Sequence, residues 1–238
     1  MTGAATLNVS ANVATVTLVS ESRLNAIDIA MARDLVRLAQ QLVTRDDIRC
    51  VLLRGAGSRA FCSGIDLKAA DATGDRAGAF AELDHHMIEM ERHFRSIGAP
   101  SVSLLRGACM GGGVLLSTMT DFRIGSTSLK YAVPAMAHGL IYPIEGLQSL
   151  AAIAGAQRAK HIVFDGRPLA PSVLLQWGIL DEMHMDADLD SAAASFTQHL
   201  ASRSQALSSI YKELFKHIGT GDIAAAHHIR SQALRKDP

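Results

Sequence analysis

A triple glycine at residues 111–113 interrupts an apolar stretch near the middle of the chain. It follows a strand-like segment at 101–105 and precedes a helix-like segment at 114–119. Glycine is costly inside a helix or strand, so three in a row indicate a place that needs bare backbone. A glycine turn that opens a helix presents unpaired N–H groups, which can hold an anion or a developing oxyanion. A tight turn with close helix–sheet packing is the alternative, and the run alone leaves both open.

The spacing of these glycines does not fit the common phosphate-binding fingerprints. Neither the dinucleotide pattern nor the P-loop pattern occurs around residues 111–113. Lysine plus arginine equal aspartate plus glutamate, at 23 each, so the formal charge is zero and the composition indicates no nucleic-acid or acidic-membrane partner. We therefore interpret the run as a donor site and not as a nucleotide loop.

The cysteines and the N-terminal sequence indicate a reducing compartment. Cys50, Cys62 and Cys109 cannot all pair with one another, and they stand in apolar segments without metal-ligand spacing. We expect structural thiols and no metal site. Residues 1–5 lack the features of a signal peptide, and no apolar run is long enough to span a membrane. The expected location is the cytoplasm, without a membrane partner.

Strand and helix patterns alternate over the first part of the chain. Residues 6–19 alternate with Asn12 at a turn, as in a hairpin, and 28–43 has helical spacing with Asp28 as its expected N-cap. The other expected elements are strands at 49–53, 101–105 and 121–129, a helix at 79–97 and an irregular stretch at 131–146. Such alternation predicts an α/β fold of β–α units stacked around parallel strands.

Beyond residue 147 the sequence predicts helices almost throughout. The segments are 147–154, 157–164, 172–177, 191–200, 206–217 and 223–234. We therefore expect a β/α core at 1–165 and a helical region at 166–238, of the kind that commonly covers a neighbour.

Six short segments carry a resemblance to a known family. They are Arg23-Leu24-Asn25-Ala26-Ile27, Val51-Leu52-Leu53-Arg54-Gly55, residues 60–67, residues 107–113, Asp121-Phe122-Arg123-Ile124, and Gly166-Arg167-Pro168-Leu169-Ala170 followed by Trp177-Gly178-Ile179-Leu180-Asp181. In this order they resemble the crotonase family, also called the enoyl-CoA hydratase/isomerase superfamily. The resemblance covers nearly the whole length and implies a spiral of repeated β–β–α units with a helical C-terminal trimerisation region, in a homotrimer or a hexamer built as a dimer of trimers.

The resemblance also implies a ligand and two backbone groups that bind it. The ligand is a thioester of coenzyme A, which is part of the substrate, so no separate cofactor is expected. The N–H groups of Ile65 and Gly112 are similar to the pair that binds the thioester oxygen in the family. Both follow small-residue turns, in agreement with the donor site expected from the glycine run.

Further residues are expected at the coenzyme A moiety, again from the resemblance. The family holds the adenine ring with backbone in the segment matching residues 60–67, which places Ala60, Cys62, Gly64 and Ile65 there. Arg23 matches a basic side chain that often meets a phosphate. On a late helix Lys212 or Lys216 could serve a similar purpose, for a neighbouring subunit, and the alternative for both lysines is a solvated charge.

The sequence departs from the family pattern at two positions. The hydratases of the family carry acidic residues where this chain has Leu115 and Ala135. A glutamate pair holds and activates the water that adds to the double bond, so the usual hydratase apparatus is missing. Other members place a single acid where this chain has Tyr142 and Pro143, and Glu145 stands two residues further on.

Two side chains are candidates for the missing acid–base. Glu145 could move a proton between C2 and C4 of an enoyl thioester, or it could simply favour the start of a helix near Gly146. His138 could act as acid or base near neutral pH, or be an ordinary solvated histidine. Tyr142 could donate a proton or merely pack.

Three functions are compatible with these residues. The first is an acyl-CoA enzyme of the enoyl-CoA hydratase/isomerase type, a lyase or isomerase with non-standard catalytic residues that stabilises an enolate at Ile65 and Gly112. The second is a decarboxylase or hydrolase on the same scaffold. The third is a catalytically silent acyl-CoA-binding subunit, which the replacements at Leu115 and Ala135 would explain directly.

Overall fold

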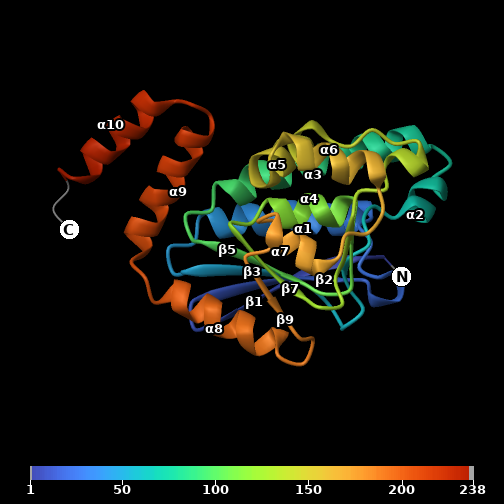
Figure 1. Cartoon of the computed structure of the whole chain (residues 1–238), viewed down its shortest axis with the longest axis horizontal. Coiled ribbons are helices and arrows are strands. Elements are labelled where there is room, and N and C mark those ends of the chain that lie inside the picture. Colours follow the sequence, from blue (N-terminus) through green and yellow to red (C-terminus); the bar gives the residue numbers. More distant parts are fainter. Residues whose placement is uncertain (1, 236–238) are drawn as a thin grey trace.

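Two sheets form the centre of the computed structural model, which describes residues 2–235 (Figure 1). The larger has the strand order β1-β2-β3-β5-β7-β9 and the smaller the order β4-β6-β8. Every pairing is parallel except β1 with β2. The strands are β1 Ala4–Ser10, β2 Val13–Val19, β3 Cys50–Gly55, β4 Ala60–Cys62, β5 Ser101–Leu105, β6 Ala108–Met110, β7 Phe122–Ser126, β8 Lys130–Ala132 and β9 Glu182–His184.

The chain begins with the predicted hairpin. Ser10 pairs with Val13, and the turn residues Ala11 and Asn12 have φ values of 48° and 63°. Two consecutive left-handed residues are the geometry of a two-residue hairpin turn, and asparagine tolerates it well. The prediction of a hairpin with Asn12 at its turn is therefore confirmed.

The spiral arises because the chain repeatedly passes from the large sheet to the small one. β3, β5 and β7 lie in the large sheet, and each is followed by a strand of the small sheet, β4, β6 and β8. Helices then return the chain. After β4 these helices are α2 Leu67–Asp71 and α3 Arg76–Arg95, and after β6 the helix is α4 Gly112–Thr118. Another helix, α1 Ile29–Val43, precedes the first repeat. The expected crotonase-like spiral of β–β–α units is confirmed.

Alternate residues of the buried strand β3 face two different cores. Val51 and Leu53 belong to the main core, which contains the apolar face of α1. Cys50 and Leu52 face the other side, where Leu189 of α8 (Leu189–Ala201) packs. Figure 1 shows α1 and α8 on opposite faces of the large sheet. A parallel strand covered on both faces is apolar throughout, as the sequence of β3 is.

Four short strands, β4, β6, β8 and β9, were missed by the sequence patterns. β6 and β8 have three residues each, and the stretch expected to be irregular contains β8, the 3₁₀ helix Met136–His138 and the start of α5. β9, also of three residues, joins the large sheet from within the region expected to be helical. Strands of this length are too short to show a period, and pairing with a neighbouring strand determines them.

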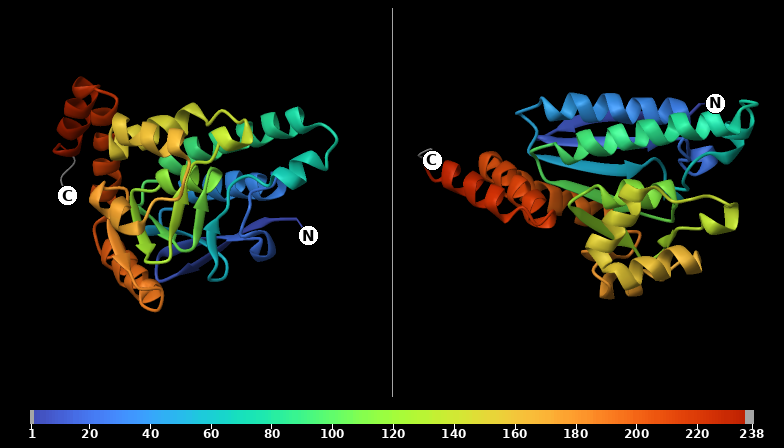
Figure 2. Two further views of the ribbon diagram at one scale, coloured as in Figure 1. Left: turned by 45° about the vertical axis from the view of Figure 1, so that its right-hand side comes forward. Right: turned by 90° about the horizontal axis from the view of Figure 1, so that it is seen from above.

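The remaining helices surround or leave this core. They are α5 Ile144–Ala154, α6 Ala156–Asp165, α7 Pro171–Gln176, α9 Gln205–Gly219 and α10 Ile223–Ala233. α9 and α10 project away from the body (Figures 1 and 2). The proposed division at residue 165 stays a prediction, with β9 and α8 packed on the sheet of the first part. Within residues 2–235, no helix has both the length and the apolar character that a membrane crossing requires.

Candidate active site

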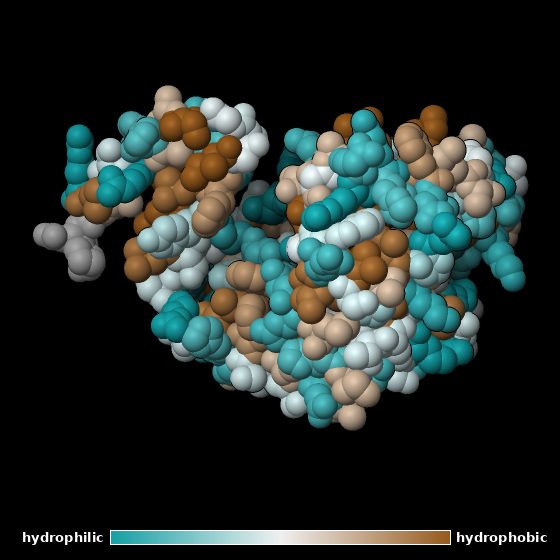
Figure 3. Space-filling model, viewed as in Figure 1, coloured by the Kyte–Doolittle hydropathy of each residue, from teal (hydrophilic) through white to brown (hydrophobic). Residues whose placement is uncertain are grey.

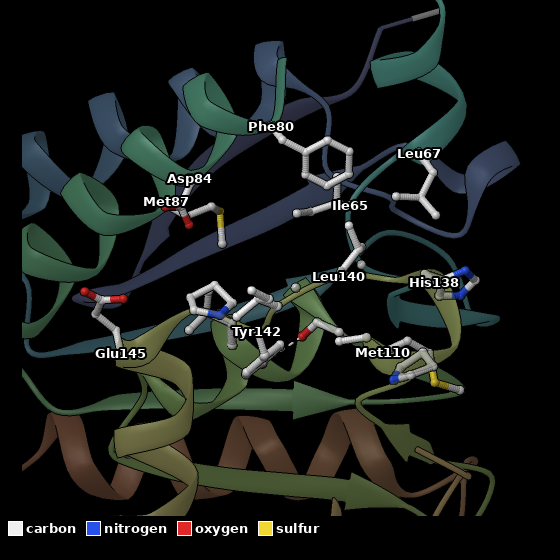
Figure 4. Close-up of a pocket in the computed structure, with 18 of the residues that line it drawn as sticks. Ile65, Leu67, Phe80, Asp84, Met87, Met110, His138, Leu140, Tyr142 and Glu145 are labelled. Atoms are coloured by element: carbon white, nitrogen blue, oxygen red, sulfur yellow. Dashed lines mark hydrogen bonds between the residues drawn. The ribbon is translucent and has the colours of Figure 1, made fainter. Parts of the chain in front are cut away.

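An apolar cavity of about 580 Å³ lies between α3, the glycine turn and the loop that precedes α5 (Figure 4). Phe80 and Met87 of α3 form one wall, and Leu140, Tyr142 and other residues of the loop face them. Cavities of this size with a few polar groups are typical of small-molecule sites. Ile65, Gly112, Glu145, His138 and Gly64 all line it, so the structure brings these five predicted site residues together.

The small sheet places the two predicted donors side by side. β4 and β6 are parallel neighbours, with Cys62 paired to Cys109, so the turns that follow them leave the same edge of the sheet. A Cβ atom built on Gly112 would lie 3.5 Å from the Ile65 nitrogen. We find no acceptor for either N–H among the backbone and side-chain groups of residues 2–235. Both donors therefore face the cavity from adjacent positions.

Hydrogen bonds hold the carbonyl groups of both donor peptides. The Gly64 carbonyl accepts from the N–H of Ile27 at 2.8 Å. The Gly111 carbonyl accepts from the Tyr142 hydroxyl at 3.0 Å and from the Leu115 N–H at 3.1 Å. Sequence patterns identified Tyr142 as a residue of the site loop but carried no signal of this contact.

Asp66 caps the short helix α2. Its carboxylate accepts from the N–H of Ala69 at 2.9 Å and pairs with the Arg23 guanidinium. Arg23 also binds Asp28 at 2.9 Å, and Asp28 caps α1 by accepting from the Met31 N–H. Burial by itself raises the pKa of Asp28, but its N–H donors and Arg23 outweigh burial and lower the pKa below its ordinary value.

Arg23 is thus held between two carboxylates in this structure. The Arg23 side chain is 28% exposed to solvent, and the side chains of Asp28 and Asp66 are 9% and 7% exposed. This arrangement joins the N-termini of α1 and α2 next to the Ile65 turn. A role of Arg23 toward a phosphate stays a prediction.

Glu145 and His138 lie at opposite ends of the cavity in Figure 4. Glu145 is half-buried in the first turn of α5, whose N-cap residue Pro143 provides no side-chain hydrogen bond. His138 ends the 3₁₀ helix Met136–His138 and is exposed. Asp84 of α3 lies toward the Glu145 end, and it is absent from the residues that the sequence predicted for the site. Its position one helical turn after Phe80, on the face that also carries Met87, was the available signal.

Four other predicted contact residues do not line the cavity. Ala60 and Cys62 are buried in β4, and burial raises the pKa of the Cys62 thiol to about 12. On α9, Lys212 binds Asp121 at 2.9 Å and the Ala99 carbonyl at 3.1 Å, and Lys216 pairs with Glu213 at 3.3 Å. Both lysines are therefore ion-paired within the chain, and their expected role at a phosphate stays a prediction.

Comparison with known proteins identifies the family. The sequence model described as "Enoyl-CoA hydratase/isomerase" matches residues 8–237. The chain belongs to the enoyl-CoA hydratase/isomerase family. Family relatives include the "Probable enoyl-CoA hydratase echA17" of Mycobacterium avium, 30% identical over 182 residues that cover 76% of this chain and 69% of the relative. Another is the 1,2-epoxyphenylacetyl-CoA isomerase of Escherichia coli, 29% identical over 198 residues that cover 82% and 75%.

Solved structures of the family share the fold. The enoyl-CoA hydratase from Bacillus anthracis superposes with a TM-score of 0.90 at 23% identity, covering 97% of this chain and 89% of that one. Leu115 and Ala135, which stand where the family resemblance implies the acids of hydratases, are buried in the cavity wall. The cavity of this family member is therefore apolar at both places.

Proposed function

We propose that this protein binds an acyl-CoA thioester and stabilises its enolate with the N–H groups of Ile65 and Gly112. The observation that carries the proposal is their adjacency, with 3.5 Å between a Cβ built on Gly112 and the Ile65 nitrogen, on the wall of an apolar cavity. Fixed donors aimed at a developing oxyanion are worth roughly 10²- to 10³-fold in rate each.

The proposed reaction is isomerisation of an enoyl thioester, with Glu145 as the proton carrier. Glu145 takes a proton from C2, the C–H electron pair moves toward the carbonyl, and the enolate oxygen is held by the two N–H groups. Return of the proton to C4 shifts the double bond and leaves the mass unchanged. The apolar residues Leu115 and Ala135 support this over hydration, because neither can hold or activate a water.

Coenzyme A enters this scheme as part of the substrate, without a separate cofactor. We propose that the turn around Gly64 and the buried segment at Ala60 and Cys62 meet the nucleotide through backbone. The cavity is bounded on that side by Ser63, Gly64 and Leu67, which supports the assignment of this edge to the coenzyme A moiety.

A silent acyl-CoA-binding subunit is the second candidate, and the buried Leu115 and Ala135 favour it. A decarboxylase or hydrolase that uses the same two N–H donors would need less acid–base chemistry from side chains, because the oxyanion site would carry most of the reaction. Turnover and product identity distinguish all three.

We also propose that the protein assembles into a trimer, alone or paired as a hexamer. Leu207, Tyr211, Phe215 and Ile218 form a stripe on α9 with exposures of 56%, 59%, 69% and 50%. Figure 3 shows apolar side chains along this helix. Large exposed apolar patches mark association surfaces. Analytical ultracentrifugation tests this, and a monomer at working concentration would contradict it.

The experiment that tests the proposed function supplies 3-enoyl-CoA and identifies the product by absorbance of the conjugated thioester and by mass. Glu145→Gln should abolish turnover while acyl-CoA affinity stays nearly intact. Asp84→Asn is the matched control, because Asp84 is an exposed carboxylate on the wall of the same cavity. His138→Asn tests the other candidate. Unchanged turnover in Glu145→Gln removes that residue from the mechanism. A product heavier than the substrate by one water would indicate hydration.

A further inference from the structure

We propose that Tyr142 is a positioning residue that fixes the Gly112 N–H through the opposite end of the same peptide group. This inference rests on the proposed function. The Tyr142 hydroxyl donates to the Gly111 carbonyl at 3.0 Å. That carbonyl and the Gly112 N–H belong to one planar peptide unit, so fixing the direction of one fixes the other.

The peptide needs such a restraint because Gly111 has an unusual backbone conformation. Its φ is 47° and its ψ −108°, a combination that only glycine adopts readily. A Cβ built on Gly111 would meet no atom within 4 Å, so crowding is not what demands a glycine there. Rotation about the Gly111 ψ angle would turn the Gly112 N–H away from the Ile65 N–H. The hydroxyl of Tyr142 opposes that rotation.

The other donor peptide has a different restraint. The Gly64 carbonyl, which shares a peptide with the Ile65 N–H, accepts from the backbone of Ile27 at 2.8 Å. That carbonyl also accepts a long contact from the Cys62 thiol at 3.9 Å, so the backbone bond is its main restraint. The second donor depends on a side chain as well as on the Leu115 N–H of its own helix. Only the second depends on a side-chain hydroxyl, which a conservative substitution can remove.

Tyr142 is itself firmly placed. The residue is 7% exposed, and its ring lies so close to Gly146 that a Cβ there would meet the tyrosine Cε1 at 2.5 Å. The following Pro143, which is the N-cap residue of α5, restricts the backbone of Tyr142. Burial keeps the phenol neutral, so it remains a donor. A donor on the carbonyl also polarises the peptide and strengthens its N–H as a donor.

Tyr142→Phe tests the proposal, because it keeps the ring and removes only the hydroxyl. We expect kcat to fall by roughly 2- to 10-fold, the range of one ordinary hydrogen bond, with KM nearly unchanged. The infrared carbonyl stretch of bound thioester should shift less from its solution frequency than in the wild type, which loss of packing alone would not cause. Tyr131→Phe is the matched control, since it removes a buried hydroxyl 3.4 Å from Ser117 and outside the cavity lining.

The outcomes distinguish failure of this positioning role from failure of the proposed function on which it rests. A full wild-type carbonyl shift and full kcat in folded Tyr142→Phe overturn the positioning role and leave the donor pair standing. No carbonyl shift in the wild type overturns both. If Tyr142→Phe does not fold, 3-fluorotyrosine at position 142 replaces it. The more acidic hydroxyl should then increase the carbonyl shift, and an unchanged shift overturns the proposal.

Discussion

The hydroxyl of Tyr142 and the carbonyl oxygen of Gly111 lie 3.0 Å apart, although 31 residues separate them in the chain. This contact joins the loop before α5 to the turn that opens α4. It is partly buried, with Tyr142 itself only 7% exposed. The geometry of the proposed donor pair and the docking of α5 are therefore coupled.

The first prediction concerns alkaline pH. Burial raises the pKa of Tyr142 and of Tyr131 well above the ordinary value of 10.0. The folded protein should keep both protons where the unfolded chain loses them, so the free energy of unfolding should fall as pH rises above about 10. Denaturant unfolding as a function of pH measures the free energy, and tyrosinate absorbance measures the ionisation of the phenols. If Tyr142→Phe reduces the alkaline absorbance change of the folded protein, the phenol is not protected as described.

The second prediction separates two neighbouring glycines. A methyl at Gly112 would lie 3.5 Å from the Ile65 nitrogen and 3.3 Å from the flexible Ile27 Cδ1, whereas a methyl at Gly113 would lie 2.4 Å from the Cys62 carbonyl oxygen. Gly112→Ala should fold and lose about 10-fold or more in turnover, because the methyl obstructs the donor pair. Gly113→Ala should lose roughly 1–3 kcal/mol of stability through overpacking. Thermal unfolding and turnover of both variants test this, and full activity in Gly112→Ala would place the reacting oxygen elsewhere.

The third prediction concerns Arg23. Arg23→Met leaves the carboxylates of Asp28 and Asp66, 9% and 7% exposed, without their cation. We expect a loss of roughly 2–3 kcal/mol, less than for a fully buried pair because Arg23 is partly exposed. Arg33→Met is the control, since its ion pair with Glu82 is exposed and should matter by less than about 0.5 kcal/mol.

The Arg23 effect should depend on pH with a definite sign. The pKa of Asp28 is lowered in the folded state, so its stabilisation is present above its ordinary value of 3.8 and is lost as pH falls below it. Denaturant unfolding at pH 7 and pH 3 should show the difference between wild type and Arg23→Met shrinking in acid. Equal differences at both pH values would argue against the ion pairs, and a large loss of acyl-CoA affinity at unchanged stability would support the predicted phosphate role of Arg23.

Local chemistry made much of the fold predictable. Asn12 lies at the hairpin turn where it was expected, and Asp28 caps α1 as expected. Each of these depends on hydrogen bonds within a few residues of the chain. The adjacency of Ile65 and Gly112 was implied only by the family resemblance, because it depends on the pairing of β4 with β6.

Contacts between distant segments were not predictable in this way. β9 exists because a short edge segment pairs with β7, where the Arg123 N–H donates to Asp181 at 2.7 Å. The bond between Tyr142 and Gly111 likewise has no local pattern. Asp84 was hidden among the polar residues of α3, and only the cavity shows which of them face the site.

Exchange of the C2 hydrogens of a saturated acyl-CoA in deuterium oxide, followed by mass spectrometry, tests enolate formation most directly. Such a thioester cannot isomerise, so exchange reports deprotonation and oxyanion stabilisation alone. We predict exchange with the wild type and with Asp84→Asn, and none with Glu145→Gln. Tight binding of the acyl-CoA without any exchange in the wild type would contradict the account and would favour a silent binding subunit.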